Sequence, residues 1–119
     1  MYDLLAQRFL LLGMKLYAHA VYDEGERMVR AIVLYEEEPD AARYEQHVAL
    51  CRKVPGGTFR HGRVFGAPMG EPPYRYYAEW EWPDMDGFKS AARSDEFMAT
   101  GKDAMEMGGK FTVMFADVD

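Results

Sequence analysis

The residues with the clearest capacity for chemistry lie on one short predicted helix within residues 40–54. Residues three and four apart share a helix face, so Tyr44, His47, Val48 and Cys51 form a single, mainly apolar stripe. Burial on such a face disfavours a charged imidazole unless a carboxylate or hydroxyl group compensates. We therefore predict His47 as the general acid or base of a site. The alternative is a neutral ring that fills the core and donates to a backbone carbonyl.

A catalytic His47 would need a phenol beside it and apolar walls around it. The other residues predicted to line this pocket are Tyr44, Cys51, Tyr76, Trp80 and Phe97. Tyr44 and Tyr76 are the phenols expected to position the imidazole or the substrate. For Cys51 a small buried hydrophobic role is the favoured interpretation. Such a site could take a proton from an acidic phenol or from a carbon next to a carbonyl.

Hydrophobic periodicity and turn signals indicate the elements that position these residues. Apolar alternation and β-branched content predict strands over residues 29–35, 58–65, 74–82 and 110–118. Helices are predicted from Asp40 to about Val54 and from Asp84 to about Met107, the second in two pieces because Ser94 offers a fresh N-cap. This order predicts the α+β class: a ferredoxin-like βαββαβ sandwich with a four-stranded antiparallel sheet.

The apolar pattern of the first and last predicted strands predicts a partner. Two helices cover only one face of the sheet, whereas residues 29–35 and 110–118 carry apolar side chains on both faces. We expect a homodimer in which a second copy covers the other face, the alternative being that residues 1–27 fold over it. Residues 28–119 are predicted to form one domain. We expect residues 1–27 to be an N-terminal extension, with an amphipathic helix over 2–12 as one interpretation and a strand starting at Lys15 as the alternative.

Composition limits the classes of function. The chain has 119 residues, 49% hydrophobic, with 14 basic and 20 acidic side chains and a net charge of −6, which argues against nucleic-acid or membrane partners. The single cysteine cannot form an internal disulfide, and no signal peptide or membrane span is evident, so a cytoplasmic protein is expected. His19, His47 and His61 are widely spaced, and His47 with Cys51 is only half a metal site, so neither metal nor cofactor is predicted.

Several segments together resemble one known family. They are Tyr44-x-x-His47-x-x-Leu50 with Lys53-Val54-Pro55-Gly56, Gly62 to Pro68 with Pro72-Pro73-Tyr74, and Ala78-Glu79-Trp80 with Ser94-Asp95-Glu96-Phe97. Over about residues 28–119 this ordered set is similar to the EthD family, named for ethyl tert-butyl ether degradation, of the dimeric α+β barrel superfamily. The chain departs from the family pattern at Gly57, where Leu or Met is usual, and at Trp82-Pro83-Asp84, where an aromatic residue, Asp and Ser are usual.

The resemblance implies a homodimeric barrel with a small apolar pocket between sheet and helices of each subunit. The superfamily includes cofactor-free monooxygenases, cyclases, decarboxylases, lactone isomerases and haem-handling proteins, and the helix histidine of the family pattern corresponds to His47. Two functions are therefore expected. One is a cofactor-independent oxygenase, cyclase or decarboxylase acting on a small apolar or aromatic metabolite. The other is a non-catalytic ligand-binding or stress-associated barrel with a structural His47. Haem ligation by His47 is a further alternative.

Overall fold

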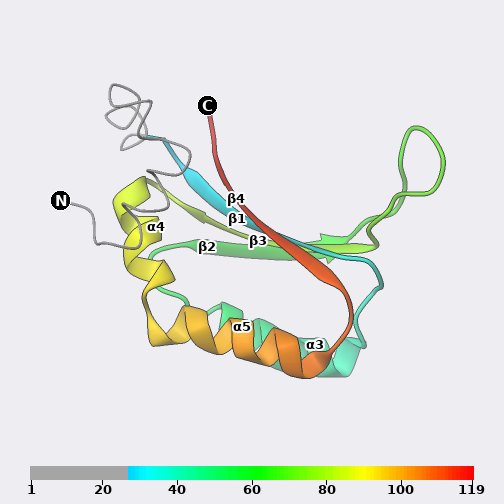
Figure 1. Cartoon of the computed structure of the whole chain (residues 1–119), viewed down its shortest axis with the longest axis horizontal. Coiled ribbons are helices and arrows are strands. Elements are labelled where there is room, and N and C mark those ends of the chain that lie inside the picture. The colour runs from blue at the N-terminus through cyan, green and yellow to red at the C-terminus, as the bar shows by residue number, and fades with distance from the viewer. Residues whose placement is uncertain (1–26) are drawn as a thin grey trace.

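The order of elements predicted from the sequence is confirmed in this computed structural model, which describes residues 27–119. The strands are β1 (Val29–Tyr35), β2 (Thr58–Arg63), β3 (Tyr76–Trp82) and β4 (Phe111–Asp117), and the helices are α3 (Ala41–Cys51), α4 (Met85–Ala92) and α5 (Asp95–Met107). The strands form one antiparallel sheet in the order β2-β3-β1-β4. Helices α3 and α5 lie side by side under one face of this sheet (Figure 1). The fold is therefore the predicted ferredoxin-like α+β sandwich.

The two faces of the sheet have different surroundings. Along β1, Val29, Ala31, Val33 and Tyr35 are buried under the helices, and the residues between them are only half-buried on the other face. This alternation follows from the period of two in a strand. β3 repeats it and adds Ala78, Trp80 and Trp82 to the core. The helix layer thus defines where a site between sheet and helices can form.

Each helix begins at a side chain that caps it. The Asp40 carboxylate accepts a hydrogen bond from the Arg43 backbone N–H at 3.0 Å, and the Ser94 hydroxyl accepts one from Phe97 at 3.1 Å. The Ser94 cap starts α5 as a separate helix after α4, as predicted. α3 ends at Cys51, earlier than predicted, with Arg52 as its C-cap. None of the described helices is long and apolar enough to span a membrane.

Two tryptophans join the end of α3 to the middle of the sheet. Trp80 Nε1 donates to the Cys51 carbonyl at 3.0 Å, and Trp82 Nε1 donates to the Pro55 carbonyl at 3.0 Å. A Cβ atom at Gly57 would lie only 2.8 Å from Trp82 Nε1. Gly57, one of the departures from the family pattern, therefore leaves room for the indole of Trp82.

The sequence expectations for residues 1–26, a helix over 2–12 or a strand from Lys15, lie outside the described residues.

Candidate functional site

A cluster of tyrosine and histidine rings lies between α3 and the sheet. Tyr44 occupies its centre, with ring centroids 5.5 Å from His47, 5.5 Å from His61, 5.2 Å from Tyr76 and 5.7 Å from Tyr35. The Tyr44 and Tyr35 hydroxyls are 3.5 Å apart. Burial raises the pKa of Tyr44, so its phenol stays protonated at neutral pH. α3, β1, β2 and β3 each contribute to this cluster.

His61 and Tyr76 form a hydrogen-bonded pair across neighbouring strands. His61 Nδ1 on β2 and Tyr76 Oη on β3 are 2.9 Å apart. Burial, with a smaller contribution from the charge of Arg52, lowers the pKa of His61. Burial, followed by the charge of Glu38, raises the pKa of Tyr76. At neutral pH the pair therefore consists of an imidazole able to accept a proton and a phenol able to donate a hydrogen bond.

This pair opens onto a cleft. The cleft has a volume of about 650 Å³ and is lined by Glu38, Pro39, Ala41, Tyr44, Glu45, Val48, Ala49, Arg52, His61 and Tyr76. Its size falls within the usual range for small-molecule sites, on the order of 300–1,000 Å³. Of the residues predicted from sequence, the two phenols Tyr44 and Tyr76 reach this cleft.

His47 lies behind the cleft, on the side of α3 that faces α5. Its side chain is 3% exposed, and Nδ1–H donates to the Asp103 carboxylate at 2.8 Å. The same carboxylate accepts two hydrogen bonds from Arg43, at 2.6 and 3.2 Å. The hydrogen bonds from Arg43, and to a smaller extent from His47, lower the pKa of Asp103 against the opposing effect of burial. Arg43, Asp103 and His47 thus form a triad that connects the two helices.

The remaining predicted pocket residues lie in the core and do not line the cleft. The Cys51 side chain is buried, and burial raises the pKa of its thiol to about 12, so the thiol stays protonated. Trp80 packs edge-on against Phe97 with ring centroids 5.3 Å apart. These three residues fill the space between α3, α5 and β3.

Sequence reasoning missed His61 and Asp103 as site residues. His61 carried one usable signal, because strand alternation places it on the same face as Phe59, which is buried. Asp103 carried no such signal in the sequence, because its partner His47 is 56 residues away in the chain. Among residues 27–119, no group of three or more histidine, cysteine or acidic side chains is arranged to hold a metal ion.

The fold and the cleft define the class: a small ferredoxin-like α+β protein with a histidine–tyrosine cleft between its sheet and helices. No protein-family model matches the sequence, and no curated protein matches it. A solved structure does: an EthD family protein from Bacillus halodurans is 35% identical, with a TM-score of 0.66, and the match covers 77% of this chain and 99% of that one. The chain belongs to the ethyl tert-butyl ether degradation (EthD) family.

Two more distant structures share the fold. A dimeric ferredoxin-like protein of unknown function from Jannaschia is 20% identical, with a TM-score of 0.60, and the match covers 76% of this chain and 99% of that one. The hydroxynitrile lyase of Passiflora edulis is 17% identical, with a TM-score of 0.61, and the match covers 79% of this chain and 95% of that one. At these identities the likeness is one of fold.

Proposed function

We propose that this protein is a cofactor-independent enzyme that binds a small apolar or aromatic metabolite in the cleft and transfers a proton on it. The observation that carries the proposal is the His61–Tyr76 pair, an imidazole and a phenol 2.9 Å apart that both line the cleft. An acid–base catalyst must reach its substrate, and this pair does so through an open cleft. A hydroxynitrile lyase with a similar fold supports the proposal at the level of fold.

The chemistry follows from the protonation states of the pair. With Nδ1–H donating to Tyr76 Oη, the other imidazole nitrogen of His61 is free to accept a proton from the substrate. The Tyr76 O–H is then free to donate to the oxygen on which negative charge develops. Suitable substrates are acidic phenols and compounds with a hydrogen on the carbon next to a carbonyl. The resulting anion cyclises onto an electrophilic carbon of the same molecule, or is oxygenated where dioxygen is the second substrate. Decarboxylation instead starts from a carboxylate, and the anion left by the loss of CO2 takes a proton from the pair.

In a second candidate mechanism, His47 is the residue that transfers the proton, as predicted from the sequence. The observation in its favour is that His47 Nδ1 contacts the Asp103 carboxylate. A carboxylate partner orients the imidazole and keeps the hydrogen on Nδ1, so that the other ring nitrogen can accept a proton. This candidate requires Tyr44 to connect His47 to the cleft, since the His47 side chain is 3% exposed. In the first candidate His47 and Asp103 serve to hold α3 against α5.

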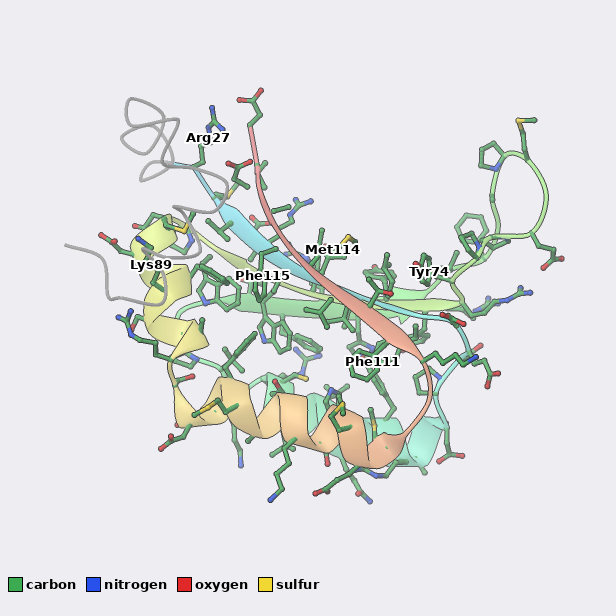
Figure 2. The ribbon with its side chains drawn as sticks, in the orientation of Figure 1. Arg27, Tyr74, Lys89, Phe111, Met114 and Phe115 are labelled. Atoms are coloured by element: carbon green, nitrogen blue, oxygen red, sulfur yellow. The ribbon has the colours of Figure 1, made fainter. Side chains whose placement is uncertain are left out.

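We further propose that the protein is a homodimer in which two copies pack their sheets together. The face away from the helices carries Ile32, Leu34 and Met114, and Met114 is 43% exposed. Figure 2 shows Met114 on this side and Phe111 on the side that faces the helices. The same face carries the ion-paired Arg30, Arg60, Glu79 and Glu81, so its apolar part lies on β1 and β4. This apolar part needs cover, and a dimeric relative with the same fold supports a second copy as that cover.

The test is deuterium incorporation in D2O, followed by NMR on a panel of small aryl ketones and β-dicarbonyl compounds. We expect the wild-type protein to catalyse exchange at the carbon next to the carbonyl. His61→Gln should lower the rate by about 100-fold or more, the usual contribution of a positioned base. Tyr76→Phe should lower it less, because the imidazole remains. A wild-type protein that binds these compounds without exchange would be a non-catalytic ligand-binding protein.

A further inference from the structure

The charges around the cleft are separated along its length. Glu45 lines it from α3, and Arg52 lines it from the C-cap position that follows this helix; the two are seven residues apart, about 10 Å along a helix axis. Between them Val48 and Ala49 form an apolar floor. Glu38 also lies near Tyr76. Burial is the main cause of the raised pKa of Tyr76, and the charge of Glu38 is the next cause. The cleft is therefore acidic at one end, apolar in the middle and basic at the end formed by Arg52.

Arg52 differs in its partners from most arginines of the described chain. Arg30, Arg43, Arg60 and Arg75 each form an ion pair with a carboxylate. Within residues 27–119 no carboxylate lies within ion-pair distance of Arg52. Its guanidinium lies instead over the face of the Phe59 ring, 5.6 Å from the centroid. A guanidinium held over an aromatic ring keeps its N–H donors available for a planar anion.

The Phe59 ring also fixes the position of Arg52 relative to the acid–base pair. Phe59 stacks on the imidazole of His61, with centroids 5.7 Å apart and an interplanar angle of 29°. Arg52 and His61 therefore both contact the Phe59 ring, which places the guanidinium and the imidazole in one neighbourhood. A molecule with an anionic group on Arg52 would extend along the apolar floor toward His61 and Tyr76.

We infer that the cleft selects small aromatic or apolar carboxylates, with Arg52 as the residue that binds the carboxylate. This inference rests on the proposed function, because it places the reacting part of the same ligand at the His61–Tyr76 pair. The guanidinium fork matches a carboxylate with two parallel hydrogen bonds, which a neutral amide cannot reproduce. Arg52 is thus a specificity-determining residue.

The test compares matched pairs of an acid and its amide by isothermal titration calorimetry. The probes are benzoate and benzamide, salicylate and salicylamide, and cinnamate and cinnamamide. We expect the wild-type protein to bind at least one acid about tenfold more tightly than its amide. A tenfold difference in affinity corresponds to roughly 1.4 kcal/mol of binding free energy, which a charge-assisted pair of hydrogen bonds can supply. Arg52→Gln should abolish this preference, because it weakens binding of the acid more than binding of the amide. Arg52→Lys should restore part of it, because the charge returns without the fork.

The matched control is Lys53→Gln, which removes the same charge from the next residue, an exposed one that does not line the cleft. It should keep the acid preference. Equal wild-type affinity for acid and amide would overturn the inference, as would a preference that survives Arg52→Gln or falls equally in Lys53→Gln. In each of these cases the proposed ligand cleft would stand. If none of the six probes binds, the inference is overturned, and the proposed function is decided separately by the deuterium exchange of the ketone and β-dicarbonyl panel.

Discussion

The two histidines of the ring cluster differ in what they touch. His61 lines the cleft beside Tyr76, whereas His47 is enclosed by α3 and α5 and bound to Asp103. Tyr44 contacts both rings. One tyrosine thus separates a histidine that can meet a ligand from a histidine that holds two helices together.

The lowered pKa of His61 gives a prediction at the scale of this residue. Burial and then the charge of Arg52 depress the pKa below its ordinary value of 6.5, so an unfolded chain takes up this proton before the folded one does. The free energy of unfolding is therefore highest above pH 6.5, where the imidazole is neutral in both states, and it decreases as the pH falls below that value. Arg52→Gln should raise the His61 pKa, as followed by NMR titration of the imidazole. An unchanged pKa would show that Arg52 does not act on His61.

The triad of Arg43, Asp103 and His47 gives a prediction at the scale of helices. Asp103→Asn removes the charge that pairs with Arg43 and should lower the free energy of unfolding by about 1–3 kcal/mol. Because the Asp103 pKa is lowered, its contribution is present at neutral pH and is lost as the pH falls below 3.8. Urea unfolding measures both effects. Glu106→Gln, an exposed site on α5, is the control and should change little.

The contact between Gly57 and Trp82 gives a second prediction at this scale. Gly57→Ala places a methyl group 2.8 Å from Trp82 Nε1, so the indole must shift and weaken its hydrogen bond to Pro55. A loss of about 1–3 kcal/mol in unfolding free energy is expected for this overpacking. Gly66→Ala should be neutral, because nothing lies within 4 Å of the added carbon. Equal stability of both variants would contradict the packing described for Trp82.

The elements were largely predictable, and the site only in part. Asp40 and Ser94 act locally as caps, and strand alternation is local too, so the order of elements was readable from the sequence. The predicted phenols Tyr44 and Tyr76 lie in one ring cluster, with centroids 5.2 Å apart, and their role stays a prediction. The face of α3 that meets α5 is decided by packing between distant segments. The sequence therefore revealed the stripe that contains His47 without revealing Asp103.

At the scale of the whole molecule, the proposed homodimer depends on the face of the sheet away from the helices. Met114→Glu would place a charge in the proposed interface, so a monomer is expected by light scattering where the wild-type protein is a dimer. Val113→Glu is the matched control, since Val113 has a similar exposure of 47% but lies on the face that carries the helices. It should leave the dimer intact. A dimer that survives Met114→Glu would argue against sheet-to-sheet packing.

The central claim is that His61 performs proton transfer in the cleft while His47 stabilises the fold. The most direct measurement compares His61→Gln with His47→Gln, each assayed for deuterium exchange and for urea unfolding. The account predicts that His61→Gln loses the exchange activity by about 100-fold or more and keeps its stability. His47→Gln should lose about 1–3 kcal/mol of stability and keep most of the activity. Loss of exchange in a stable His47→Gln, with activity retained in His61→Gln, would contradict the account and identify His47 as the base.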